Sequence, residues 1–211
     1  MIFKQIAIGG DRNFAYFIGE ERSRLAAVVD PAYNPQRLVE IAGQQGMTVK
    51  YVLNTHGHSD HSNGNDFILK KTGATLVGKG VLSPGVSPRD GERLPLGVLT
   101  LQVIHTPGHT DDSICFLVQN KLITGDTLFV GKVGGTGFGN DARMEYDSIH
   151  NKLLKLPDDV EVYPGHDYGV APTSTIDHEK KTNPFILRES FEAFLDLKKN
   201  WLEYKREHGI A

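Results

Sequence analysis

Three histidines and one aspartate fall within six consecutive positions of this chain, directly after a strand-like run at residues 49–53. Residues 54–61 read Asn-Thr-His-Gly-His-Ser-Asp-His, and the ligand-type residues are His56, His58, Asp60 and His61. Imidazole and carboxylate groups suit zinc, iron and manganese. Four donors this close cannot all reach one ion from a rigid element, whereas on a strand-to-helix loop alternate side chains diverge. The segment therefore predicts ligands for two adjacent ions; a polar surface loop is the alternative.

Three later segments each place one more ligand-type residue after an apolar, strand-like run. In chain order these residues are His109, Asp126 and His166. A glycine precedes each of them, which lets the backbone turn sharply at the end of a strand and direct the next side chain inward. Asp60 has a second interpretation, as the N-cap of a helix predicted at about 63–72. We expect it to be a ligand because of its neighbours.

The order of apolar runs predicts the fold class. An antiparallel meander is expected from β-type runs at 2–8, 14–18 and 25–29, followed by a helix that starts at Pro35. Further strands, a helix at 143–156 and a last strand at 161–163 complete the pattern. Strands, a helix, more strands and another helix predict an α/β (α+β) chain with two sheets and helices outside. We expect a single domain over 1–211 with a C-terminal helix at about 187–208.

Two glycine-rich segments lack a clear period. Residues 78–91 are expected to form a loop. Residues 131–141 hold five glycines but no Gly-Lys-Ser/Thr ending, so they do not form a phosphate-binding loop. We interpret this second segment as a mobile flap beside the metals.

Composition narrows the classes of partner and compartment. The net charge of −3 gives no broad basic surface, so we expect no nucleic-acid partner. No apolar run approaches the roughly 20 residues that span a bilayer, and the first residues lack the pattern of a signal peptide. The single Cys115 lies in an apolar strand pattern, where a buried, inert thiol is expected. A cytoplasmic protein without membrane contact is predicted.

The His-x-His-x-Asp-His run, followed in order by a histidine, an aspartate and a histidine, resembles the metallo-β-lactamase fold superfamily. The resemblance extends from about residue 10 to residue 188 and implies an αββα sandwich with a dinuclear site at one edge. It implies that His56, His58 and His109 hold one metal, that Asp60, His61 and His166 hold the other, and that Asp126 bridges them. The true zinc β-lactamases use a cysteine in place of this bridging aspartate.

This ligand set implies hydrolytic chemistry. Two cations a few ångströms apart lower the pKa of a bridging water and stabilise the oxyanion that its attack creates. Asp60 and Asp126, the two carboxylates of the set, are the residues to which we assign a catalytic role besides metal binding. The histidines outside the motif segments are expected to be structural or solvated, namely His105, His150, His178 and His208. Asp30, which ends a strand before a proline, is also interpreted as structural.

Within the superfamily, the chain resembles two groups of enzymes. Short glyoxalase II-like hydrolases and persulfide dioxygenases share its pattern Ser174-x-x-x-x-Glu179-x-x-x-Asn183-Pro184. The first group implies a thioesterase of the hydroxyacylglutathione hydrolase type with two divalent ions, which are zinc or alternatively iron or manganese. The second implies a sulfur dioxygenase with one iron, held by His56, His109 and Asp126. Both groups retain all seven ligands, so the ligand set alone leaves both open.

The chain departs from these groups at the positions that bind substrate. Both groups usually carry arginine where Gly135 stands here, and the dioxygenases often carry arginine where Phe185 stands. Such arginines help to grip the carboxylates of glutathione. Tyr168 and Lys132 are the substrate-binding candidates that remain, with packing and a solvated lysine as the alternatives. We expect a small-molecule thioester or thiol-derived substrate. A non-catalytic metal-bound module and a homo-oligomer are further alternatives.

Overall fold

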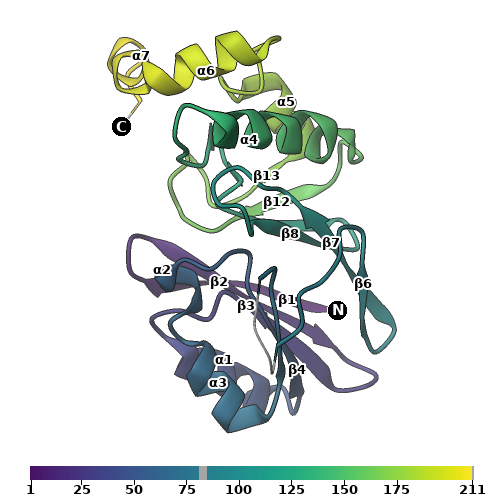
Figure 1. Cartoon of the computed structure of the whole chain (residues 1–211). Coiled ribbons are helices and arrows are strands. Elements are labelled where there is room, and N and C mark those ends of the chain that lie inside the picture. The colour runs from purple at the N-terminus through teal and green to yellow at the C-terminus, as the bar shows by residue number, and fades with distance from the viewer. Residues whose placement is uncertain (81–84, 211) are drawn as a thin grey trace.

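The computed structural model describes residues 1–80 and 85–210. Its elements form four layers, with helices, a sheet, a second sheet and helices following one another (Figure 1). The αββα sandwich expected from the resemblance is therefore confirmed. Residues 81–84, a part of the loop expected at 78–91, lie outside the described residues.

The first sheet has five strands in the order β1-β2-β3-β4-β5. They are β1 (Ile2–Gly9), β2 (Asn13–Glu20), β3 (Leu25–Val29), β4 (Thr48–Leu53) and β5 (Thr75–Val77). The first three pair antiparallel, as the predicted meander requires, and β3, β4 and β5 pair parallel. Parallel neighbours need crossover connections. Helix α1 (Pro35–Gln44) supplies the first, and α2 (Ser59–Ser62) with α3 (Asn65–Thr72) supplies the second.

The second sheet has six strands in the order β13-β12-β9-β8-β7-β6. They are β6 (Arg93–Leu96), β7 (Leu99–His105), β8 (Ile114–Val118), β9 (Lys121–Gly125), β12 (Glu161–Pro164) and β13 (Ser174–Thr175). The hairpin of β10 (Leu128–Phe129) and β11 (Lys132–Val133) lies beside it. Helix α4 (Asn140–Asn151) and the 3-10 turn η1 (Leu153–Lys155) connect β9 to its parallel partner β12. Helix α5 (Ile176–Thr182) follows.

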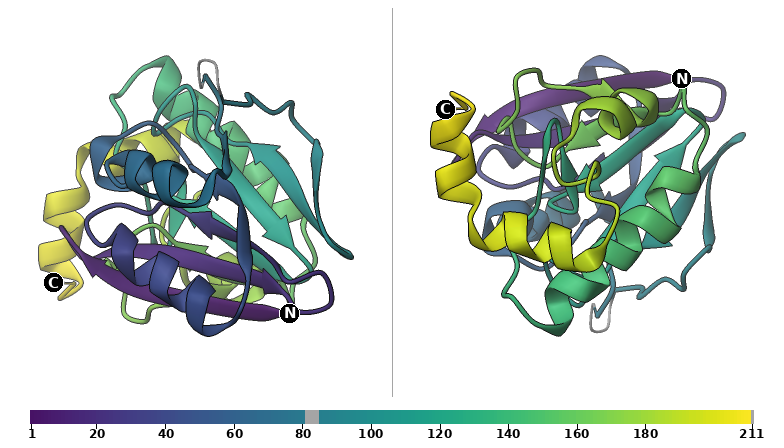
Figure 2. Two further views of the ribbon diagram at one scale, coloured as in Figure 1. Left: turned by 90° about the horizontal axis from the view of Figure 1, so that it is seen from below. Right: turned by 90° about the horizontal axis from the view of Figure 1, so that it is seen from above.

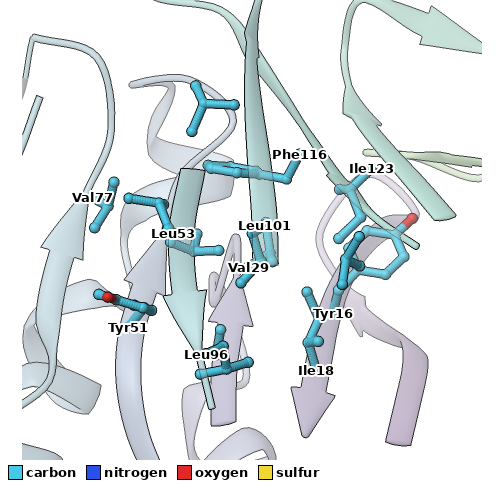
Figure 3. Close-up of a cluster of buried hydrophobic side chains, with 14 of the residues drawn as sticks. Tyr16, Ile18, Val29, Tyr51, Leu53, Val77, Leu96, Leu101, Phe116 and Ile123 are labelled. Atoms are coloured by element: carbon cyan, nitrogen blue, oxygen red, sulfur yellow. The ribbon is translucent and has the colours of Figure 1, made fainter. Parts of the chain in front are cut away.

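The main core fills the space between the two sheets. Strand β2 is buried along its whole length because alternate side chains face opposite layers. Tyr16 and Ile18 point toward Leu101, Phe116 and the rest of the second sheet (Figure 3). The intervening side chains of β2 pack instead against α1 and α3, which cover the outer face of the first sheet (Figure 2). Two apolar interfaces therefore fix the register of this strand.

The C-terminal segment differs from the single helix expected at about 187–208. It forms two helices, α6 (Phe191–Lys199) and α7 (Trp201–Glu207), separated by Asn200. Asn200 has φ −103° and ψ 16°, which are not helical values, so the axis breaks there. Ser190 begins α6 by accepting a hydrogen bond from the Ala193 amide. Phe191, Phe194 and Trp201, which recur at helical spacing, pack in the apolar cluster on the outer side of the second sheet.

Two other segments have different bounds from those expected from the sequence. Of the glycine-rich segment at 131–141, residues 132–133 pair as a strand and residues 140–141 already belong to α4, which leaves 134–139 as the loop. The expected helix at 143–156 ends at Asn151 and continues only as η1.

In the described part of the chain, no helix combines the length and the apolar character that a bilayer span needs.

Candidate metal centre

Every ligand-type segment of the sequence lies where a strand ends, at one edge of the space between the sheets. The β4 end leads into His56, the β9 end into Asp126 and the β12 end into His166. Backbone hydrogen bonds hold this edge together: within the second sheet the Gly165 amide donates to the Gly125 carbonyl at 2.8 Å, and between the sheets the Phe14 amide of β2 donates to the Gly165 carbonyl at 2.8 Å. The edge is therefore held together independently of its side chains.

Three imidazole nitrogens converge in the first group. His58 Nδ1 lies 3.0 Å from His56 Nε2 and 3.1 Å from His109 Nε2. Nitrogens that share a tetrahedral zinc at about 2.0–2.1 Å are about 3.3 Å apart, so this spacing fits one ion within a few tenths of an ångström. His56 is buried, His109 is half-buried and His58 is exposed, so the group opens toward solvent on the His58 side.

A second group forms beside it. His61 Nε2 lies 3.2 Å from His166 Nε2, and Asp60 Oδ2 lies 3.5 Å from the first nitrogen and 3.4 Å from the second. Asp60 does not cap a helix: His58 occupies the N-cap position of α2. Asn13 Nδ2 donates to Asp60 Oδ2 at 3.1 Å, which fixes the carboxylate toward the histidines.

Asp126 lies between the two groups. Its Oδ2 is 3.7 Å from His109 Nε2 and 3.3 Å from His166 Nε2, while its Oδ1 is 3.4 Å from His61 Nε2. Oδ1 is buried and has no hydrogen-bond partner among the described residues. A buried carboxylate oxygen without a partner is costly. A cation beside it would remove that cost, so the donor set fits metal ions.

The rear nitrogens of the histidines are held by the surrounding chain. His61 Nδ1 donates to Asp30 Oδ2 at 3.0 Å, His109 Nδ1 to the Gly135 carbonyl at 2.7 Å, and His166 Nδ1 to the Asp11 carbonyl at 2.8 Å. Each bond leaves Nε2 free to face the centre and fixes the plane of the ring. Asp30 is thus a specific partner of a ligand, more than the structural strand end expected from sequence.

Asp30 is itself fixed by the segment that carries the ligands. The Thr55 amide donates to Asp30 Oδ1 at 2.8 Å, and Thr55 Oγ1 donates to Asp30 Oδ2 at 2.7 Å. The Asp30 side chain is 1% exposed and its φ is +49°, a left-handed conformation that is uncommon outside glycine. The hydrogen bonds that its carboxylate makes give the physical reason for this conformation.

The buried charges set the protonation of the metal-free site. Burial, followed by the charge of His61, lowers the pKa of His56 to about 4. Burial also opposes protonation of His61, but the charge and hydrogen bond of Asp30 outweigh it and raise the pKa of His61 to about 9. Asp126 is buried too, yet its bond to His166 and the charge of His61 hold its pKa well below the ordinary range. Metal binding would therefore displace a proton from His61.

Gly165 and Gly125 are required by close approach. A Cβ on Gly165 would lie 2.4 Å from Asp126 Oδ1 and 2.9 Å from His61 Cε1. Gly125 has φ +50°, and its Cβ would lie 2.5 Å from Thr55 Oγ1. The glycine before a ligand thus does more than permit a turn, because at these two positions the neighbouring site residues occupy the space of the side chain.

The pattern at 174–184 supports the loop beside the centre. Glu179 Oε2 accepts from the Gly131 amide at 2.9 Å and from Asn183 Nδ2 at 2.7 Å, and Asn183 Nδ2 also reaches the Lys132 carbonyl at 3.3 Å. Farther along, the ammonium of Lys198 donates to the Gly134 carbonyl at 2.7 Å. The chain is therefore anchored at Gly131 and at Gly134, just before Gly135, whose carbonyl accepts from His109.

The two substrate-binding candidates lie together beside the second ligand group. The Tyr168 ring stacks on His166 with centroids 4.5 Å apart and planes at 8°. Lys132 Nζ lies 4.9 Å from the Tyr168 centroid and is half-buried. Both side chains are partly exposed to solvent.

The four histidines that were expected to be structural or solvated take no part in the two ligand groups or in the contacts of Asp126. Cys115 is buried, and burial raises its pKa to about 12.

Several residues that support the site stand in no recognisable sequence pattern. Asn13 was unremarkable at the start of a strand, and its partner Asp60 is 47 positions away. Glu145 and Lys198 form a buried ion pair between α4 and α6. Their separation of 53 positions leaves no local pattern that could have revealed it.

The seven converging ligands agree with a family model. The model of the metallo-beta-lactamase superfamily matches residues 8–80 and 77–166, which is more than half of the chain. The chain belongs to this superfamily. Among curated relatives, it is 35% identical over 170 residues to a probable hydroxyacylglutathione hydrolase, glo2, of Schizosaccharomyces pombe. The match covers 76% of this chain and 66% of the relative, slightly less than two thirds of its length.

Two other members are also similar. The mitochondrial persulfide dioxygenase ETHE1 of Homo sapiens is 30% identical over 194 residues, covering 89% of this chain and 76% of the relative. The crystal structure of ETHE1 from Myxococcus xanthus superimposes with a TM-score of 0.89 and 37% identity, covering 95% of this chain and 91% of that one. The superfamily members to which the chain is similar thus include both enzyme groups that the sequence resembles.

Proposed function

We propose that the chain is a metal-dependent thioesterase of the hydroxyacylglutathione hydrolase type. The observation that carries this proposal is the position of Asp126, whose carboxylate lies within 3.7 Å of a ligand nitrogen in each of the two groups. In the proposal His56, His58 and His109 hold one ion, Asp60, His61 and His166 hold the other, and Asp126 contacts both. The ions are divalent, with zinc first and iron or manganese as alternatives.

Two bound cations supply a water of lowered pKa and a positive charge for the oxyanion that its attack on a carbonyl creates. The chain provides the rest. Asp60, with a side chain 31% exposed, lies where it can accept a proton from an attacking water. Asp126 keeps its negative charge between the groups because its pKa is held low. The leaving thiolate is stable enough to depart without a strong acid, and no such acid is assigned.

The substrate side of the proposal rests on Tyr168 and Lys132. The half-exposed Tyr168 ring stacks on His166 and offers an apolar surface, and Lys132 adds a positive charge beside that ring. A small thioester with an anionic thiol part matches these groups. We propose a small-molecule enzyme on this basis. The net charge of −3, without a broad basic surface, supports the absence of a nucleic-acid partner, and the single cysteine supports a cytoplasmic location.

Metal counting and thioester hydrolysis test the proposal together. The purified protein, loaded with zinc, manganese or iron, is expected to bind two ions by elemental analysis and to hydrolyse S-lactoylglutathione or another acyl thioester. His58→Ala removes a ligand at the exposed side and should abolish hydrolysis with the fold intact by circular dichroism. His105→Ala, outside the ligand groups, is the matched control. Inactivity across a broad thioester panel with two ions bound would refute the thioesterase.

A persulfide dioxygenase is the second candidate. Its support is the extent of the similarity to the Myxococcus xanthus ETHE1 structure, which leaves only a small part of either chain unmatched. Two histidines and one carboxylate, here His56, His109 and Asp126, are the ligand type of mononuclear iron oxygenases. This candidate requires one iron per chain and oxygen uptake with a persulfide. The absence of oxygen uptake by the ferrous protein would eliminate it.

A further inference from the structure

The turn between β1 and β2 brings an arginine to the rim of the metal centre. Arg12 has φ +60°, a left-handed conformation, and its side chain is exposed. The turn is fixed to the segment that carries His166: the Asp167 amide donates to the Arg12 carbonyl at 2.9 Å, and His166 Nδ1 donates to the Asp11 carbonyl at 2.8 Å. The backbone of Arg12 is therefore positioned by a metal-ligand segment 154 residues later in the chain.

The guanidinium of Arg12 shares an aromatic ring with Lys132. Its Cζ lies 4.8 Å from the centroid of Tyr168, and Lys132 Nζ lies 4.9 Å from the same centroid. Because Tyr168 stacks on His166, both cations are one ring away from a ligand of the second group. The Tyr168 hydroxyl donates to Asp11 Oδ2 at 2.5 Å, which holds the ring in this position.

Two cations contact the Tyr168 ring, whereas one carboxylate, that of Asp11, accepts a hydrogen bond from its hydroxyl. Within residues 1–80 and 85–210, neither Arg12 nor Lys132 forms an ion pair with a carboxylate. Burial and the nearby charges of Lys205 and Arg12 lower the pKa of Lys132. Two cations that repel each other across one partly exposed ring form a site that an anion would stabilise. The planar guanidinium additionally suits a carboxylate, which it can bind with two parallel hydrogen bonds.

We infer that Arg12 is a specificity-determining residue that binds a carboxylate on the thiol part of the substrate. The inference rests on the proposed thioesterase. With the acyl carbonyl at the metal centre, the thiol part extends over Tyr168, and its carboxylate meets Arg12 with Lys132 beside it. Arg12 then acts in binding, so its removal raises KM for an anionic substrate far more than it changes kcat.

A pair of thioesters with one acyl group tests this assignment. The N-acetylcysteine thioester carries a carboxylate, and the N-acetylcysteamine thioester lacks it. In Arg12→Met the ratio of kcat/KM for the first to kcat/KM for the second should fall about ten- to hundredfold, the loss expected for a charge-assisted hydrogen bond. Arg12→Lys should restore a part of the ratio. Arg22→Met, an exposed arginine beyond the opposite end of β2, should leave it unchanged.

A binding measurement separates this inference from the proposed reaction. S-hexylglutathione, a thioether that cannot be hydrolysed, is titrated calorimetrically into wild type, Arg12→Met and Arg22→Met. A Kd raised tenfold or more only in Arg12→Met supports the assignment even if no thioester is turned over. Equal Kd values, or an equal loss on both thioesters, would overturn it while leaving the thioesterase standing. Dependence on Arg12 only with a coenzyme A thioester would overturn the carboxylate in favour of a phosphate.

Discussion

Removal of the Lys198 ammonium should destabilise the protein, and the loss of stability should be larger at pH 8 than at pH 5. Lys198 pairs with Glu145 between α6 and α4, and the two side chains are 5% and 0% exposed. Lys198→Met keeps the length of the side chain but leaves a buried carboxylate without its cation. Breaking a buried pair costs about 3–5 kcal/mol when the remaining charge stays ionised, and protonation of Glu145 lowers that cost. The second bond of the ammonium, to the Gly134 carbonyl, is lost as well and adds about 1 kcal/mol.

The pH dependence follows from Glu145. Burial already raises its pKa above the ordinary value of 4.5, against the opposing charge of Lys198, and removal of that charge raises it further. Burial raises the pKa of Glu145 to about 7 in the wild type, so below pH 7 both folded proteins carry this proton and their difference in stability does not change with pH. Between pH 7 and the higher pKa of the variant, folded Lys198→Met keeps a proton that folded wild type loses, so the stability of the variant relative to wild type falls as pH rises through this window. We expect a loss of about 1–2 kcal/mol at pH 5, and a loss about 1.4 kcal/mol larger at pH 8.

Urea unfolding of metal-saturated wild type and variant at each pH measures this difference, because a common metal load cancels the pH dependence of metal binding. The double variant Glu145→Gln with Lys198→Met has no buried charge at either position, so its stability relative to wild type should depend on pH much less than that of Lys198→Met. A loss for Lys198→Met that is the same at pH 5 and pH 8, or that persists unchanged in the double variant, would refute the reasoning.

Three other substitutions probe the site and the core. Asp30→Asn removes the charge that holds His61, so metal affinity of the second group should fall about ten- to hundredfold by competition with a chelator, with the first group less affected. Gly165→Ala places a methyl group 2.4 Å from Asp126 Oδ1, and elemental analysis should find fewer than two ions per chain. Phe116→Ala, at a position that is 0% exposed, should cost about 3–5 kcal/mol in urea unfolding with metal content unchanged.

The residues that sequence reasoning found share a local signal. The first ligands of the four segments need no distant partner to be recognised: His109, Asp126 and His166 each follow a glycine at the end of an apolar run, and His56 opens a segment of six residues that holds three histidines and Asp60. The two-sheet fold followed from the order of the apolar runs and of the helices between them. The parallel pairing of β3 with β4 and of β9 with β12 then brings the strand ends together.

The supporting residues had no such signal, because each depends on a partner far away in the chain. Asp30 marks only the end of a strand until α2 places His61 against it. Arg12 is one exposed arginine among others until the β1–β2 turn lies beside Tyr168. The break at Asn200 was missed for a different reason. Apolar residues recur at helical spacing on both sides of it, from Phe191 to Leu202, so their period predicted one helix where the backbone angles make two.

The metal centre joins the two halves of the sandwich. His56, His58, Asp60 and His61 follow a strand of the first sheet, whereas His109, Asp126 and His166 follow strands of the second. Each ligand group draws on both sheets, since His109 completes the first and His166 the second. A bound ion would therefore cross-link layers that are otherwise joined by the apolar core and by hydrogen bonds such as the one from the Phe14 amide to the Gly165 carbonyl. Binding free energy gained only in the folded state adds to its stability, so in this fold the site that performs the proposed chemistry also holds the sheets together.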